Sequence, residues 1–146
     1  MTKPPNYTTT VAPEKTATEC VLALGRFGAS QVTLFFSPAR LPVGITFILD
    51  AGHGARGYKL GVDLTRTLDA LKAAQIPRAH ANPAQAQRTA WKTLQAWLEA
   101  NLTLIETGLM NAEQVLLTYE VDTEGRSRWE VESANRSVTA GVVVDR

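Results

Sequence analysis

The first patterned stretch of the chain has apolar residues at a helical period. They recur every three or four positions, at Ala17, Cys20, Val21, Leu24 and Phe27, which is the spacing of one helix face. A proline at position 13 suits the start of a helix and a glycine at position 28 its left-handed cap, so a helix is predicted over residues 13–27. The cysteine on its stripe is predicted to be a buried, unreactive thiol. Residues 1–12 have no periodicity and are predicted to form a flexible N-terminal arm.

The next segments alternate between apolar and polar residues, as strands do. Val32, Leu34 and Phe36 alternate with their neighbours, and residues 43–49 repeat this pattern after a proline-containing turn at 37–42. Two such runs joined by a short turn predict an antiparallel hairpin. Residues 51–57 are predicted to be a glycine-rich loop and residues 58–62 a short third strand.

Capping residues mark the beginnings of two further helices. Asp63 is predicted to cap a helix that stops at Pro77. Asn82 is followed by proline and then by Gln85 at the third helical position, as in a capping box. The long helix that begins there extends to about Thr107 and is predicted to be mostly buried. Its apolar stripe is Trp91, Leu94, Leu98, Leu102 and Ile105.

The last third of the chain is predicted to return to strands. Asn111 is predicted to cap one more helical turn, and residues 116–121 and 126–132 to form strands around a hairpin turn at 122–125. Residues 138–144 are predicted to be an edge strand or a docked tail. The predicted order is α-β-β-β-α-α-β-β. It describes a single α+β domain over residues 13–146, with an antiparallel sheet packed against the long helix of the C-terminal half.

Composition bounds the class of protein. The 146 residues are 45% hydrophobic and 20% charged, which is typical of one soluble globular domain. No apolar run approaches the ~18–20 residues of a membrane span, and the first residues lack the apolar centre of a signal peptide. A cytoplasmic protein with no membrane partner is therefore expected. The single cysteine excludes an internal disulfide.

The net charge of +1 conceals an uneven distribution. Residues 20–92 hold nine basic and three acidic residues, whereas residues 93–146 hold four basic and nine acidic residues. A basic half indicates an anionic partner. The same asymmetry also fits attraction between the two halves, within the fold or between subunits, and it fits a solvated surface with no partner.

One motif carries the nucleic-acid interpretation. Residues 52–57 match G-x-G-x-x-G, but the dinucleotide fingerprint needs a helix to begin there, and a strand is predicted instead. A mobile basic loop suits contact with phosphates, because its cations adjust to an irregular anion. The candidate nucleic-acid-binding residues are Arg26, Arg40, His53, Arg56 and Lys59.

No arrangement of residues predicts catalysis, a metal site or a cofactor. Asp50 and His53 are only two ligands of unlike type. Trp91 and Trp97 are predicted to be core residues, and the aromatic candidates for stacking on bases are Tyr58, Tyr119 and Trp129. The candidate residues for binding a protein partner are the acidic Glu120, Glu130 and Glu132.

Several motifs resemble a known group of proteins. They are Gly28-Ala29, Ile45-x-Phe47, Ala86-x-x-x-Ala90-Trp91, Trp97-Leu98-Glu99-Ala100, Ile105-Glu106-x-Gly108-x-Met110 and Leu116-Leu117-x-Tyr119. Over roughly residues 20–120 the chain resembles small uncharacterised proteins of bacteriophages and mobile elements. Thr118 stands where that pattern usually has proline. The resemblance implies a setting among phage replication and recombination accessories, and no specific chemistry.

Two functions are carried forward. The first is a non-catalytic accessory protein, expected to form a homo-oligomer, whose basic residues 20–92 contact single- or double-stranded nucleic acid. The alternative is a protein-binding modulator that docks on a host or phage enzyme through the acidic C-terminal hairpin. A continuous basic face favours the first, and an interleaved surface with an exposed apolar patch favours the second. An enzyme whose site is assembled only in three dimensions is the third and weakest interpretation.

Overall fold

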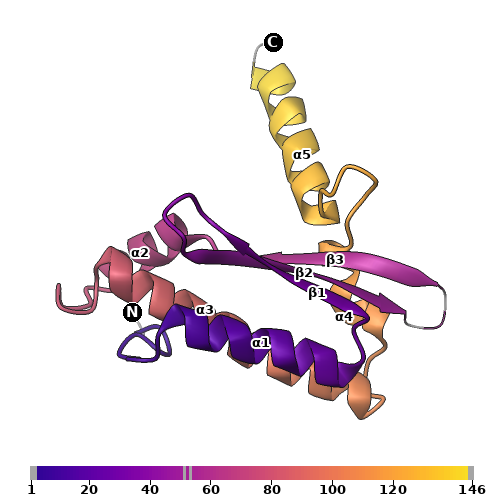
Figure 1. The fold of residues 1–146 in the computed structure, drawn as a ribbon. Helices are drawn as coiled ribbons and strands as arrows, with labels where there is room; N and C mark the ends of the chain where they lie inside the picture. Colours follow the sequence, from indigo (N-terminus) through magenta and orange to yellow (C-terminus); the bar gives the residue numbers. More distant parts are fainter. Residues whose placement is uncertain (1–2, 51, 53, 145–146) are drawn as a thin grey trace.

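The chain forms a small sheet with helices beneath it and one helix rising above it (Figure 1). The computed structural model describes the backbone of residues 3–50, 52 and 54–144, and side chains as far as residue 137. In chain order the elements are α1 (Pro13–Phe27), β1 (Gln31–Phe36), β2 (Pro42–Asp50), β3 (Ala55–Gly61), α2 (Leu64–Ala73), α3 (Pro83–Glu106), α4 (Ala112–Leu116), the 3-10 helix η1 (Leu117–Tyr119) and α5 (Arg128–Val144).

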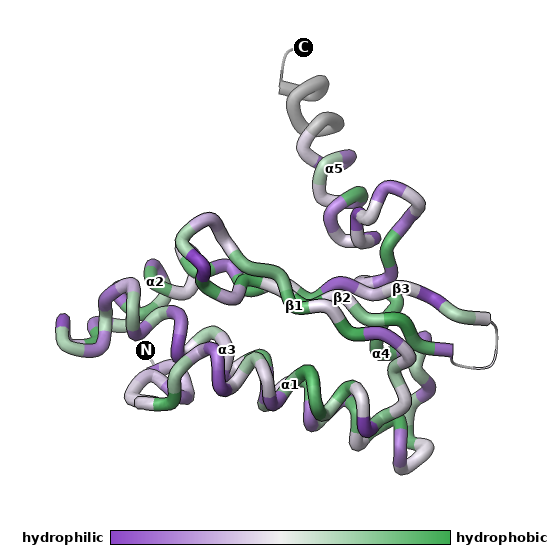
Figure 2. Tube along the Cα trace, viewed as in Figure 1, coloured by the Kyte–Doolittle hydropathy of each residue, from purple (hydrophilic) through white to green (hydrophobic). Residues whose placement is uncertain are grey.

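The sheet is antiparallel, with the strands in the order β1-β2-β3. α1 and α3 pack against each other and lie along one face of the sheet, and hydrophobic residues recur along the strands and these helices (Figure 2). The opposite face is open, apart from the side where the C-terminal segment and α5 lie (Figure 1). The predicted α+β class and the antiparallel sheet are confirmed.

Trp91 lies at the centre of the core. Its side chain is 0% exposed, and its Nε1 donates a hydrogen bond of 2.8 Å to the carbonyl oxygen of Pro42. Beside it, the rings of Phe47 and Tyr58 stack with their centroids 5.3 Å apart. The predicted core position of Trp91 is confirmed. Tyr58, by contrast, is buried and cannot serve as the base-stacking platform suggested by the sequence.

The caps predicted from the sequence fix the helix boundaries. α1 has the predicted bounds, and Gly28 after it has a φ of 123°, in the region that favours glycine. The side chains of Asp63, Asn82 and Asn111 each accept a hydrogen bond from the third residue of the helix that follows. In the described part of the chain, no helix combines the length and the apolar character needed to cross a membrane.

The glycine-rich loop is shorter than predicted. β3 already begins at Ala55, so Arg56 belongs to a strand and pairs with Leu49 of β2. The Asp50 carboxylate closes the turn, because its Oδ1 accepts hydrogen bonds from the backbone N–H groups of Gly52 at 2.8 Å and Gly54 at 3.2 Å. The prediction of a mobile basic loop over residues 51–57 is therefore wrong for its second half.

The C-terminal third is helical where strands were predicted. Residues 116–119 belong to α4 and η1, and residues 128–144 form α5, so the predicted strands at 116–121, 126–132 and 138–144 are wrong. Only the turn survives, since Gly125 N donates to the Asp122 carbonyl oxygen at 3.0 Å and an isolated bridge joins Val121 to Ser127. The order α-β-β-β-α-α-β-β is thus corrected to three strands followed by helices.

Part of the N-terminal arm is anchored. Gln85 Nε2 donates hydrogen bonds of 2.9 Å to the carbonyl oxygens of both Tyr7 and Thr9, and Thr89 Oγ1 donates to that of Asn6 at 3.1 Å. Because the Gln85 side chain is engaged in this way, it does not complete the predicted capping box. Residues 6–9 therefore rest on α3, although the whole arm was predicted to be flexible.

The thiol of Cys20 is expected to be inert while the chain is folded. The side chain is 1% exposed, and burial, with smaller contributions from Glu99 and Glu19, raises its pKa to about 12. Since the thiolate is the reactive form, folding lowers the reactive fraction at mildly alkaline pH by about a thousandfold. An aromatic disulfide reagent is therefore expected to label the folded chain at least about a hundredfold more slowly than the denatured chain. Comparable rates in the two states would contradict the burial of this thiol.

Candidate functional site

The structure does not gather the predicted basic residues into one site. Arg26 is in the last turn of α1 and Arg40 in the β1–β2 turn, at opposite ends of the molecule (Figure 1). Arg56 and Lys59 lie on β3, where odd spacing turns them to opposite faces. His53 lies outside the described residues.

The two cations of β3 are paired with acids of the C-terminal segment. Arg56 Nη1 lies 3.1 Å from Glu120 Oε1, and Lys59 Nζ lies 3.2 Å from both carboxylate oxygens of Glu130. Exposed pairs of this kind contribute about 0–1 kcal/mol each. These pairs bring the basic and acidic halves of the sequence together within the fold. They neutralise two of the cations that the sequence assigns to nucleic-acid binding.

α5 begins at a reciprocal cap that the sequence analysis missed. Ser127 N donates to Glu130 Oε1 at 3.0 Å, and Glu130 N donates to Ser127 Oγ at 3.2 Å. The backbone N–H of Ser127, and then Lys59, lower the pKa of Glu130. The Ser-x-x-Glu spacing before an N-terminus is a capping-box signature, and it could have predicted this helix.

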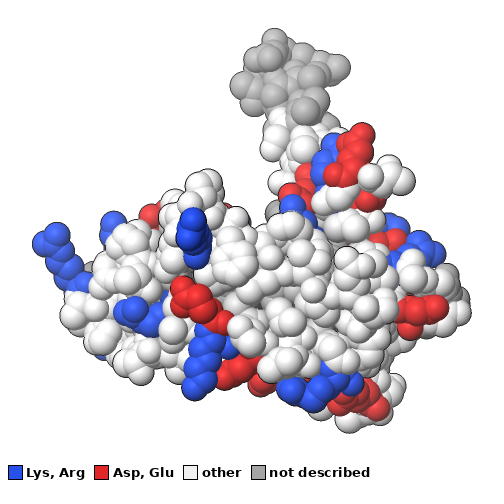
Figure 3. Space-filling view, in the orientation of Figure 1, with Lys and Arg blue, Asp and Glu red and all other residues white. Residues whose placement is uncertain are grey.

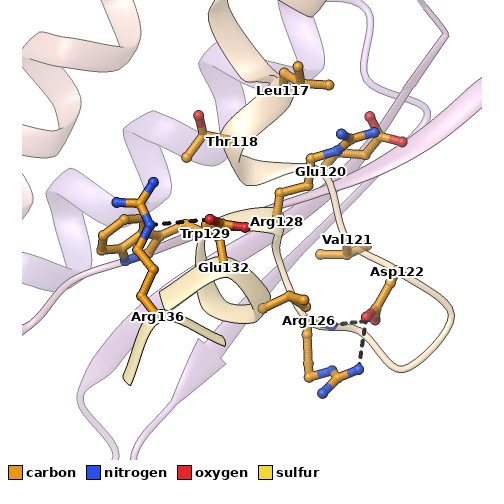
Figure 4. A pocket seen from close by; sticks show the side chains of 11 residues that line it. Leu117, Thr118, Glu120, Val121, Asp122, Arg126, Arg128, Trp129, Glu132 and Arg136 are labelled. Atoms are coloured by element: carbon orange, nitrogen blue, oxygen red, sulfur yellow. Dashed lines mark hydrogen bonds and ion pairs between the residues drawn. The ribbon is translucent and has the colours of Figure 1, made fainter. Parts of the chain in front are cut away.

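A hollow lined by charged residues lies between η1, the 122–125 turn and the first turns of α5 (Figure 4). Four of the charges that line it are paired within the segment: Arg126 with Asp122 at 3.3 Å and Arg136 with Glu132 at 3.2 Å. Backbone N–H groups of Arg126 and Glu124 hold the pKa of Asp122 below its usual value. The Asp122 carboxylate accepts hydrogen bonds from these two backbone groups, and the Glu132 carboxylate accepts one from Arg136 Nε. The predicted partner-binding residues Glu120, Glu130 and Glu132 are likewise each in an ion pair.

The open face of the sheet forms a groove lined mostly by apolar and small residues. The residues that face the groove form rows across the three strands, set by the strand register. One row is Phe35, Gly44 and Gly61, and the next is Thr33, Thr46 and Lys59. The groove has a volume of about 650 Å³ and continues as far as Val121 and Gly125 of the C-terminal segment.

Gly44 and Gly61 leave part of the base of this groove without side chains. A Cβ at Gly44 would lie 3.1 Å from the Leu60 carbonyl oxygen, whereas a Cβ at Gly61 would have only the ordinary contact of 3.8 Å with Val43 O. Glycine within a strand often marks a close approach of another backbone or a ligand. Two exposed aromatic side chains lie at or beside the groove: Phe35, which lines it, is 45% exposed, and Trp129, in an adjoining hollow, is 52% exposed.

The described residues contain no group of three or more His, Cys, Asp or Glu side chains that could hold a metal ion. Of the remaining aromatic candidates, Tyr119 is in η1 and meets Trp97 edge-on at 5.3 Å, and Trp129 is in α5, so neither lies on a strand. The chain matches no protein-family model, no curated protein and no solved structure.

Proposed function

We propose that the protein is a non-catalytic binding protein that holds an apolar helix of a partner protein on the open face of its sheet. The observation that carries this proposal is the composition of the groove. Lys59 is the only charged residue among those that line it, and its ammonium group is already paired with Glu130. An antiparallel sheet face exposed to water is ordinarily rich in polar and charged residues. A sheet face whose one charge is paired, and which has glycines at its base, is complementary to an apolar surface of a partner protein.

The dimensions favour a helix as the occupant. Three strands spaced about 4.8 Å apart present a face about 10 Å wide, close to the diameter of one helix. Binding an amphipathic helix in such a groove is a common mode of peptide recognition. The covered face of this sheet already packs against α1 and α3.

The charges support a protein partner more than nucleic acid. On the face of the molecule seen in Figure 3, Lys and Arg residues are interspersed with Asp and Glu, and no continuous basic area is visible. A phosphate bound at β3 would have to displace Glu120 from Arg56 or Glu130 from Lys59. Nucleic-acid binding, and the phage setting suggested by the resemblance, stay predictions from the sequence. The acidic C-terminal hairpin of the alternative interpretation is replaced by the sheet face as the contact surface.

Filling the groove is the direct test. Gly61→Ile adds a side chain to the floor where a Cβ meets no close contact, and isoleucine favours a strand. Thr65→Ile on the exposed side of α2 is the matched control. Helical peptides are first selected for binding to the full chain from a library of amphipathic sequences. Their affinity for the Gly61→Ile variant is expected to be at least about tenfold lower, because the new side chain displaces apolar contacts and a loss of about 1.4 kcal/mol of binding free energy weakens binding tenfold. They are expected to bind the Thr65→Ile variant normally.

Two results would overturn the proposal. One is a selection that yields only peptides whose affinity is independent of position 61. The other is salt-dependent binding of single- or double-stranded DNA or RNA by the parent chain with an affinity that Gly61→Ile leaves unchanged, since counterion release is the mark of phosphate contact.

A further inference from the structure

The outer edge of β1 has unused backbone hydrogen-bonding groups. Val62 N donates to the carbonyl oxygen of Val43 at 3.0 Å, so the odd-numbered residues of β2 turn their backbone groups to β3 and the even-numbered ones to β1. Their partners in β1 are Gln31, Thr33 and Phe35. Val32 and Leu34 therefore turn their N–H and C=O groups outward, and no described residue bonds to them.

This edge lacks the features by which proteins normally protect a free strand. β1 has the sequence Gln-Val-Thr-Leu-Phe-Phe, with no charge and no proline. Natural edges are commonly protected by lysine, proline, a bulge or a covering segment. The bulge between Phe35 and Phe36 ends the regular register, and residues 31–35 keep a constant register with β2. At the other edge of the sheet, Val121 N donates to the Gly57 carbonyl oxygen at 2.9 Å, so the C-terminal segment occupies part of that edge.

The surroundings of β1 are partly apolar. Exposed side chains include Leu22 of α1 at 54%, Phe35 at 45% and Phe36 at 55%. α1 turns Glu19 toward α3, where Gln95 Nε2 donates a hydrogen bond of 2.6 Å to its carboxylate. By helical geometry the side of α1 turned away from α3 carries Glu14, Thr18, Val21 and Gly25, and Leu22 lies between that side and Glu19. Figure 3, in which α1 and β1 lie in front, shows an uncharged area over β1.

We infer that β1 pairs with β1 of a second copy of this chain, antiparallel and with the two-fold axis at Thr33. In this register Val32 faces Leu34 of the second copy, and the outward groups of both residues form reciprocal hydrogen bonds on each side of the axis. The two sheets become one of six strands, and the two α1 helices lie on the same face of it.

A second copy fits this edge better than an unrelated strand for a specific reason. The outward residues are spaced symmetrically about Thr33, so the edge is complementary to itself, as a two-fold interface requires. The pairing also continues the core across the interface, since Val32 and Leu34 both pack against the buried cluster of their own subunit. This contact lies on the β1 edge and does not depend on a partner in the groove.

A charge at the two-fold axis tests the register. Thr33 is exposed and its side chain is on the open face, so Thr33→Lys leaves the core intact while placing two ammonium groups opposite each other. Like charges that meet across an interface are strongly unfavourable. The parent chain is expected to sediment as a dimer, and Thr33→Lys to raise the dimer dissociation constant by about tenfold or more.

Mixing opposite charges controls for damage to the fold. Thr33→Glu is expected to weaken the dimer by itself, and a mixture of the Thr33→Lys and Thr33→Glu chains is expected to form a heterodimer, because opposite charges then face each other. A misfolded variant would show no such recovery. A parent chain that stays monomeric up to millimolar concentration, a dimer unaffected by Thr33→Lys, or a mixture that fails to recover would each overturn the inference.

Discussion

Replacing Trp91 by alanine is expected to lower the free energy of unfolding by about 3–5 kcal/mol, the usual cost of truncating a fully buried aromatic side chain. The indole is 0% exposed and lies between α3 and the sheet. A loss of this size is a large part of the roughly 5–15 kcal/mol that stabilises a domain. Urea denaturation followed by circular dichroism measures it. A change below about 0.5 kcal/mol, as expected for a surface position, would place the indole outside the core.

Trp91→Phe separates the hydrogen bond from the packing. Phenylalanine retains most of the apolar contact but leaves the buried Pro42 carbonyl oxygen without the indole donor, which costs about 1–3 kcal/mol. Trp129→Ala is the control, because that side chain is 52% exposed and its truncation is expected to change stability by no more than about 0.5 kcal/mol.

The helices could be predicted because their signals are local. Pro13, Asp63 and Asn82 each act on backbone groups within the next turn, so a short window of sequence contains the whole interaction. The apolar stripe of α3 likewise predicted which residues face the core, and the burial of Trp91, Leu98 and Leu102 agrees with it.

The C-terminal third shows how two local patterns can compete. Trp129 and Val131 alternate with charged residues, which suggests a strand, whereas Ser127 and Glu130 have the spacing of a helix cap. The cap prevails, because its two reciprocal hydrogen bonds form as soon as the first turn does. Among the described residues, no strand pairs with residues 128–132.

The groove and the ion pairs could not be predicted because they depend on long-range register. The sequence shows glycines at 44 and 61, but only the pairing of β2 with β3 makes them neighbours. It shows a basic and an acidic half, but only the folded chain brings Lys59 to Glu130, 71 residues further along. Attraction between the two halves was one of three alternatives that the charge distribution left open.

Replacing Gln85 by alanine is expected to release the N-terminal arm from α3. The amide donates to two carbonyl oxygens of the arm, and its Oε1 accepts from Arg88 Nη2 at 2.7 Å. Each such bond contributes about 0.5–1.5 kcal/mol net to stability. We therefore expect the free energy of unfolding to fall by about 1–3 kcal/mol, less than the sum over the lost bonds, because the freed carbonyl oxygens form hydrogen bonds with water. Chymotrypsin cleavage after Tyr7 under native conditions is expected to become faster, because the arm then opens without global unfolding.

Two further variants show whether the amide itself holds the arm. Gln87→Ala removes a glutamine from the same helix that is not bonded to the arm, and its cleavage rate is expected to match that of the parent chain. Gln85→Glu keeps the size of the side chain but, when ionised, sets acceptor oxygens against the carbonyls of Tyr7 and Thr9. It is expected to release the arm at least as fully as alanine does. Equal cleavage rates in all four proteins would mean that packing around Tyr7, including its edge-on contact with His80 at 6.0 Å, anchors the segment without Gln85.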